Sequence, residues 1–242
     1  MVKTGLKTFV LLGMAMLCVV ANAGKRAHKI WMAEVDYEFS YQGFTDVEPG
    51  EMPKTAVLLV SGNNTCRTTQ TEFLTSSIIG NKTKNALINL AVTPEIKSAT
   101  LCDSADIAAG QASLKFDIQG KGKYKKILGY PCHGYDIVIE DVAAGLKYTE
   151  EVWATDYIGG KDVNFYLYPE VKGVILYSKK TDGKEVTVMQ AKAVSKRVAI
   201  EAGTFWYPYG CEVNTCSGEQ VFDEEELTEG ETEGEGEETT EE

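Results

Sequence analysis

The feature of this sequence that most constrains its fold is a set of short segments in which apolar and polar residues alternate. In residues 30–41, one set of alternate positions is Trp31, Ala33, Val35, Tyr37, Phe39 and Tyr41, and the other is Met32, Glu34, Asp36, Glu38 and Ser40. Successive side chains of a strand point to opposite faces, so a period of two places one set on each side. The segment therefore predicts a strand with one buried face and one solvated face.

The same pattern recurs along the chain. Leu114, Phe116 and Ile118 form a second alternating set, and Tyr135, Ile137 and Ile139 form a third. Residues 174–177 and 186–189 flank Asp182-Gly183, a pair favoured in tight hairpin turns, and segments 55–60 and 152–154 are further strand candidates. One-sided alternation repeated this often predicts an antiparallel sheet with its apolar side on the core.

Helical signals are few. Segments 72–79 and 84–90 could each form a short helix or a loop, and residues 120–123 (Gly-Lys-Gly-Lys) are interpreted as a hairpin turn, because they lack the spacing of a phosphate-binding loop. The apolar face of the sheet needs a cover. We expect the sheet to roll over a short helix, over its own far strands or over a ligand.

The first 23 residues have the three parts of a secretory signal peptide. Lys3 and Lys7 precede an apolar run that is too short to span a membrane, and Ala21-Asn22-Ala23 supplies the small residues of a cleavage site. We expect cleavage before Gly24, export to the periplasm or the medium, and no membrane span in the mature chain. The alternatives are an uncleaved anchor and a lipoprotein signal that uses Cys18.

Charge is distributed unevenly along the chain. The formal net charge is −12, yet residues 219–242 hold 13 acidic and no basic side chains, whereas residues 24–218 hold 22 basic and 23 acidic ones. The near-neutral body gives no electrostatic footprint for nucleic acid. We expect a single folded domain over 24–218 and a disordered acidic tail over 219–242, because that tail has too few apolar residues to order itself. Weak binding of calcium or of a basic partner is the alternative role of the tail.

Export also permits disulfides. The mature chain would keep five cysteines, which are Cys66, Cys102, Cys132, Cys211 and Cys216. Five cysteines cannot all pair within one chain, so at least one is left over. We expect a Cys211–Cys216 bond, then a Cys66–Cys102 bond, with Cys132 free; alternatively, several of them are buried thiols without a bond. The chain has no Cys-x-x-Cys pair and only two histidines, His28 and His133, so no metal site is predicted.

No catalytic set stands out from the sequence, and no cofactor is expected. Cys132 and His133 are neighbours on a predicted strand, where they would point to opposite faces. Nothing singles out two carboxylates for a hydrolytic pair. Aromatic residues crowd the stretch 153–209, either as core or as the wall of an apolar groove for a lipid-like or peptide ligand. The groove candidates are Trp153, Tyr157, Phe165, Tyr177 and Phe205.

The order of short motifs after Lys125 resembles a family. The pieces are KKILGYPCHGYDIVIED, TEEVWATDYI, VKGVILYSKKTDGKEVTVMQAKAV and FWYPYG. Their pattern is similar to that of exported Gram-negative proteins of unknown function, the GLPGLI-type relatives in the superfamily of the outer-membrane lipoprotein carrier LolA. The matching residues are Ile127, Gly129, Tyr130, Cys132, Tyr135, Trp153, Thr155, Gly173, Leu176, Tyr177, Phe205, Pro208 and Gly210.

The resemblance implies an α+β, mainly β fold, in which a curved antiparallel sheet forms an open half-barrel over one or more short helices. It covers residues 125–210 only. Residues 164–168 depart from the acidic, Met-rich stretch of the family, and Cys211, Cys216 and the acidic tail are additions. No binding residue of the carrier itself can be matched, so its lipoprotein-binding function is not transferred.

Three functions remain open at this point. The first is an exported, non-catalytic module that binds an apolar ligand, lipid-like or peptide, on the concave face of the sheet. The second is a structural or interaction protein of the cell envelope that binds another envelope protein and takes no small ligand. The third is a hydrolase that uses two carboxylates roughly 5–10 Å apart in a cleft.

Overall fold

A computed structural model of the chain describes residues 29–45, 47–48, 50–142, 144–218 and 220–221. The expected signal peptide, and the acidic tail beyond residue 221, lie outside these ranges. Within them, thirteen strands form one sheet in the order β13-β12-β6-β5-β4-β3-β2-β1-β11-β10-β9-β8-β7.

Strands β1 to β6 precede helix α2 in the chain and strands β7 to β11 follow it, while β12 and β13 return to the edge beside β6. The first strands are β1 (Met32–Gln42), β2 (Thr55–Ser61), β3 (Asn64–Gln70), β4 (Thr75–Asn81), β5 (Ala86–Val92) and β6 (Lys97–Cys102), followed by helix α2 (Ser104–Ser113). The later elements are β7 (Leu114–Ile127), β8 (Tyr130–Asp141), β9 (Leu146–Thr155), β10 (Val174–Asp182), β11 (Glu185–Lys196), the 3-10 helix η1 (Ala202–Phe205), β12 (Glu212–Thr215) and β13 (Gln220–Val221).

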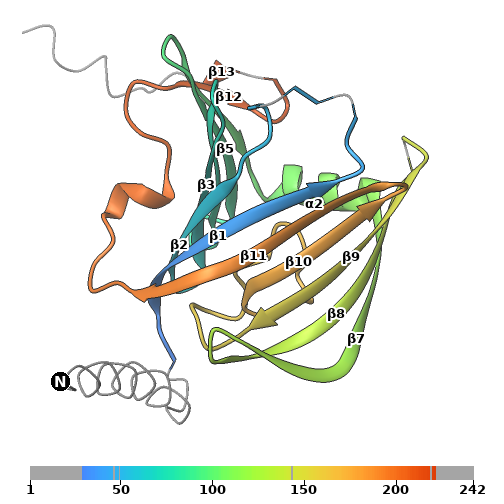
Figure 1. Cartoon of the computed structure of the whole chain (residues 1–242). Helices are drawn as coiled ribbons and strands as arrows, with labels where there is room; N and C mark the ends of the chain where they lie inside the picture. The colour runs from blue at the N-terminus through green and yellow to red at the C-terminus, as the bar shows by residue number, and fades with distance from the viewer. Residues whose placement is uncertain (1–28, 46, 49, 143, 219, 222–242) are drawn as a thin grey trace, which may run out of the picture.

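The sheet is bent and open (Figure 1). In this view β1 and β11 to β7 form the front layer, and β2 to β5 turn away behind it. β7 and β13 are the two edges, so the sheet does not close into a barrel. All neighbours are antiparallel except β12 and β6. A curved, mainly antiparallel sheet is thus confirmed, with one parallel pair added at its edge.

Alternation predicted individual strands where one face is wet. In β1, Ala33, Val35 and Tyr37 are buried, as expected, and β10 and β11 pair as the predicted hairpin. Other local predictions were wrong. Segments 72–79 and 84–90 contribute to β4 and β5 rather than to helices, and residues 120–123 lie inside β7, at a break in its pairing with β8. The turn falls instead at Leu128 and Gly129, which both have positive φ.

A loop covers the concave side of the sheet. This inner loop, residues 156–173, connects β9 to β10 and runs between the two layers (Figure 1). Its Ile158 and Val163 pack into the core of β1, β2, β10 and β11, and its Tyr168 and Val171 pack against β8 and β9. The expected helix does not play this part, because α2 buries no residue.

The C-terminal segment covers the outer face of the other half of the sheet. Phe205 and Val213 pack with Cys66, Ile79 and Ile88, and the side-chain amide of Asn81 donates a hydrogen bond to the Phe205 carbonyl at 2.9 Å. β3 to β5 are therefore covered on their outer face by this segment. Beyond this segment, β13 pairs with β12, so the folded body extends two residues into the predicted tail.

The disulfide differs from both expected pairs. Cys102 is bonded to Cys216, with Cα atoms 5.0 Å apart, and Cys66 and Cys211 are free thiols. Because Thr215 of β12 lies opposite Leu101 of β6, the next residues of the two parallel strands come together. Cys211 and Cys216 instead bracket extended β12, which holds them about 16 Å apart at 3.3 Å per residue. Cys132 is free, as predicted.

Candidate functional site

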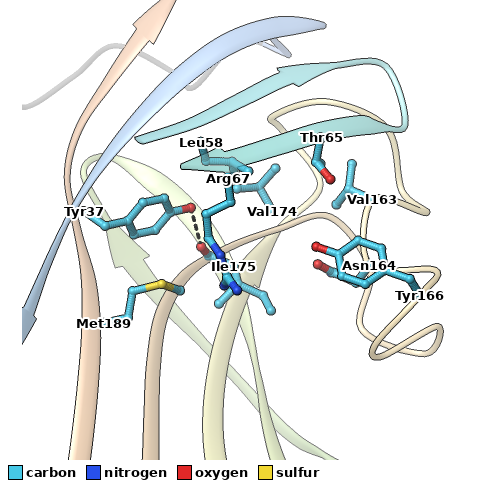
Figure 2. Close-up of a pocket in the computed structure, with 10 residues that line it drawn as sticks. All are labelled: Tyr37, Leu58, Thr65, Arg67, Val163, Asn164, Tyr166, Val174, Ile175 and Met189. Atoms are coloured by element: carbon cyan, nitrogen blue, oxygen red, sulfur yellow. Dashed lines mark hydrogen bonds between the residues drawn. The ribbon is translucent and has the colours of Figure 1, made fainter. Parts of the chain in front are cut away.

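A cavity of about 50 Å³ lies between the sheet and the inner loop (Figure 2). The residues that line it are Tyr37, Leu58, Thr65, Arg67, Val163, Asn164, Tyr166, Val174, Ile175 and Met189. A single buried water needs about 10–15 Å³ of such space, so the cavity has room for a few waters or one small ionic group. It is a small, partly open space on the concave side.

Strand register explains why these side chains converge. Leu58 of β2 lies opposite Arg67 of β3, and Val60 lies opposite Thr65. Thr65 and Arg67 are two positions apart on one strand, so both project to the same face. In Figure 2 Arg67 reaches from β3 into the space between Tyr37 and the loop residues Asn164 and Tyr166.

Arg67 has no polar partner in the described part of the chain. It makes no hydrogen bond or ion pair there, its side chain is partly buried, and no acidic residue is among those that line the cavity. Burial raises the pKa of nearby Tyr37, and the positive charge of Arg67 opposes that rise. The Tyr37 hydroxyl donates to the Ile175 carbonyl at 2.8 Å, which leaves it unable to donate to an occupant of the cavity.

Thr65 is the second unsatisfied group of the cavity. The residue is 3% exposed, and its hydroxyl oxygen finds no hydrogen-bond partner among the described residues. Leaving a buried hydroxyl unsatisfied costs about 1–3 kcal/mol. The cavity thus presents a cation and a free hydroxyl among apolar walls.

The inner loop is anchored mainly at its ends. The backbone N–H groups of Gly159 and Gly160 donate to the carbonyls of Ile30 and Gly62, and the Asn164 side chain donates to the carbonyls of Val171 and Gly173. The middle, residues 165–168, is tied to other elements by two hydrogen bonds, from the Gln111 amide to the Phe165 carbonyl and from the Tyr168 hydroxyl to the Glu150 carboxylate, and backbone hydrogen bonds within the loop add to them. The middle therefore has fewer hydrogen bonds to other elements than the start of the loop.

Two of the predicted groove residues are neighbours but lie on the opposite face. Tyr177 of β10 is paired with Trp153 of β9. The residues that flank Trp153 in β9 point inward and pack against the loop, so Trp153 and its partner Tyr177 point to the outer face. The Trp153 indole N–H donates to the Glu151 carboxylate at 2.7 Å, and the Lys125 ammonium lies 5.7 Å and 5.1 Å from the centroids of the Trp153 and Tyr177 rings. Trp153 is 8% exposed, so this pair is outer-face packing and lines none of the described pockets.

The other three groove candidates are scattered. Tyr157 lines an open hollow of about 500 Å³, together with Lys29, Tyr124, His133 and other mostly exposed residues. Phe165 lies in the inner loop, edge-on to Tyr166, with the Lys82 ammonium 4.8 Å from its ring centroid. Phe205 belongs to the C-terminal segment and is buried between that segment and the outer face of β3 to β5. The sequence reasoning missed Thr65 and Arg67, because no alternation marks β3.

A pair of carboxylates meets on the outer face. Asp136 and Glu151 both contact the Lys121 ammonium, at 2.7 Å and 3.3 Å. The hydrogen bond from Trp153, and then the contact with Lys121, lower the pKa of Glu151. A catalytic carboxylic acid requires the opposite shift, since it must hold its proton near neutral pH. This arrangement therefore suits an ion-pair network better than acid catalysis.

Neither a metal-binding cluster, nor a membrane-spanning helix, nor a match to a known protein was found for the described residues or the sequence. The described residues include no group of three or more His, Cys, Asp or Glu side chains that could hold a metal ion, and no helix among them is long and apolar enough to cross a membrane. No protein-family model and no curated protein matches the chain. Function is consequently argued here from the site itself.

Proposed function

We propose that this protein is an exported, non-catalytic binding protein of the bacterial cell envelope that holds an apolar ligand on the concave side of its sheet. The observation that carries the proposal is the cavity between the inner loop and strands of both layers, which contains an arginine with no polar partner among the described residues. Small-ligand sites are concave and mostly apolar, with a few polar groups that orient the ligand.

The walls of the cavity suit a flexible apolar ligand. Leu58, Val163, Val174, Ile175 and Met189 supply most of its surface. Methionine side chains adapt readily to different shapes. The 50 Å³ of existing space is smaller than an acyl chain, so uptake requires the middle of the inner loop to move outward. This movement would break the Tyr168–Glu150 and Gln111–Phe165 hydrogen bonds, which are the two ties of that segment to other elements.

Two sequence features support the cellular setting. The signal-peptide pattern of residues 1–23 favours export, and the LolA-like pattern over 125–210 favours a half-barrel carrier architecture. In the fold, the matched region supplies β8 to β11 and the inner loop, which make up one side of the enclosure. Thr65 and Arg67 come from outside the matched region, so the ligand of the carrier is not inferred from it.

The alternative of an envelope protein that works through a free sheet edge is less well supported. β7 is a 14-residue edge strand, which could in principle pair with another chain. Its lysines are Lys115, Lys121, Lys123, Lys125 and Lys126. Lysines and breaks in pairing are the usual means by which edge strands avoid pairing with other sheets. The edge therefore has the character of a protected one.

Titration with the uncharged apolar dye Nile red tests the proposal. We expect saturable binding with about one dye per chain, and native mass spectrometry of protein from a periplasmic extract should show a bound small molecule. Leu58→Phe, which fills the cavity, should weaken dye binding. The matched control is Val57→Phe, because Val57 is the neighbouring residue on β2 and points to the other face. Absence of saturable binding, or equal effects of both substitutions, would contradict the proposal.

A further inference from the structure

We propose that the ligand carries a carboxylate at the end of an acyl chain and that Arg67 binds this carboxylate, with the Thr65 hydroxyl as the second donor. The inference rests on the proposed function and extends it to the chemical class of the ligand. It assigns a binding role to two residues on one face of β3.

The first step is the placement of the donors. Thr65 and Arg67 enter the cavity from the same wall, and Asn164 and Tyr166 of the inner loop form the facing wall (Figure 2). A guanidinium group offers five N–H donors in a planar fork, which matches the two oxygens of a carboxylate. The Thr65 hydroxyl can donate a further hydrogen bond to the same group.

The second step is charge. Arg67 is partly buried, and partial loss of hydration favours pairing of its charge with an anion. The ion pairs of the described residues involve Lys121, Lys172, Lys192 and Arg197, and none involves Arg67. Burial raises the pKa values of the cavity residue Tyr37 and of Tyr168, so these phenols stay neutral and cannot balance the charge. An anionic ligand supplies what the described side chains do not.

The third step is size and wall chemistry. The existing space of about 50 Å³ accommodates a carboxylate, which is the smallest organic anion that fills a guanidinium fork. The groups next to Arg67 are apolar, with Leu58 directly opposite it across β2 and β3. An acyl chain attached to the carboxylate would lie along these side chains once the middle of the inner loop moves aside. Inorganic anions would leave the apolar walls without a partner.

The test compares dodecanoate, dodecanol and dodecyl phosphate as competitors of Nile red on the full chain. Charge-assisted hydrogen bonds contribute about 1.5–3 kcal/mol, so we expect wild-type protein to bind dodecanoate about 10- to 100-fold more tightly than dodecanol. Arg67→Gln should remove this preference and leave the affinity for dodecanol unchanged. Arg197→Gln is the matched control, since it makes the same charge change at a surface residue paired with Glu34, and it should keep the preference.

A second variant is used if circular dichroism shows that Arg67→Gln does not fold. Thr65→Val should lower the affinity for dodecanoate several-fold and spare dodecanol, because it removes one donor and preserves shape. Equal affinities for dodecanoate and dodecanol in wild-type protein, or tighter binding of dodecyl phosphate, would overturn the carboxylate assignment and leave apolar binding standing. Failure of all three compounds and of Nile red to bind would overturn both proposals.

Discussion

The ring of Tyr166 in the inner loop rests directly on the backbone of Gly80 in β4. A Cβ atom added to Gly80 would lie 2.6 Å from Cε1 of this ring and 2.9 Å from the Thr65 hydroxyl oxygen. Only glycine leaves room for such an approach. This contact joins the inner loop to the far half of the sheet and fixes one wall of the cavity.

Gly80→Ala should therefore push the Tyr166 ring away from β4. We expect a loss of about 1–3 kcal/mol in the free energy of unfolding, the usual cost of overpacking. Urea denaturation measures it. In the double variant Gly80→Ala/Tyr166→Leu the loss should shrink, because the two residues are in contact and their effects are not additive. Gly120→Ala is the control, since a Cβ there meets nothing within 4 Å. Equal losses for Gly80 and Gly120 would contradict the packing described above.

The Cys102–Cys216 bond should contribute strongly to stability, because it joins residues 114 positions apart. A bond that closes so long a loop contributes about 2–5 kcal/mol. Cys102→Ser should lower the midpoint of guanidinium unfolding, and a reducing agent should do the same to the wild-type protein. Cys211→Ser, at a free cysteine, is the control and should leave the midpoint nearly unchanged. Peptide mapping without reduction that found Cys211 joined to Cys216 would refute the pairing.

Trp153 and Trp31 offer a direct contrast between a packed and an exposed indole. Trp153 is 8% exposed and Trp31 is 61% exposed. Trp153→Ala should cost about 3–5 kcal/mol of stability, as for other large buried side chains, while Trp31→Ala should stay within about 0.5 kcal/mol of wild type. Because Trp153 lies on the outer face, its loss should not weaken Nile red binding at temperatures where the variant is folded. Lost dye binding with full stability would instead place Trp153 in the ligand site.

Alkaline pH should destabilise the protein in part through Cys132. Burial of this fully enclosed thiol raises its pKa from 9.0 to about 11. The folded state holds the thiol proton more tightly than the unfolded state does, so this contribution is present below about pH 9 and is lost as pH rises toward 11. A shift of this size corresponds to about 3 kcal/mol. Urea unfolding from pH 7.5 to 10.5 measures the slope.

Cys132→Ala should flatten the pH dependence above pH 9 but not abolish it, because burial raises the pKa values of Tyr37 and Tyr168 in the same direction. Cys66 gives an independent check. Its pKa is also raised by burial, so neither thiol should react with a disulfide reagent at pH 8 until the protein is unfolded. Fast reaction of Cys132 in folded protein would show that the thiol is not enclosed.

Strands with one face in water were easier to predict from the sequence than strands without such a face. β1, β7 and β8 were predicted by alternation, because one side of each faces water, which favours polar residues in every second position. β10 and β11 were predicted from the Asp182-Gly183 turn between them. β4 and β5 were mistaken for loops or helices, because Ile79 and Ile88 pack under the C-terminal segment and no clean alternation marks these strands. Helix α2 had a usable signal that was overlooked, the reciprocal capping of Asp103 and Asp106.

The residues of the ligand site were likewise not the ones that stand out in the sequence. The aromatic stretch 153–209 drew attention because it is conspicuous in the sequence, but its members went to different faces of the sheet and to the loop. The groups that define the cavity, Thr65 and Arg67, are ordinary residues of an unpatterned strand. Their significance comes from what surrounds them, namely the absence of an acid among the lining residues and the loop that encloses them.

By itself the sequence determined that this chain forms strands, that many of them have one apolar face and that its charge is concentrated after residue 218, because side-chain alternation and composition are local properties. Only the tertiary structure decided that Cys102 meets Cys216, that a loop rather than a helix covers the concave face, and that Arg67 has no polar partner among the described residues. These outcomes depend on the register between strands far apart in the chain, and no local window of residues specifies that register.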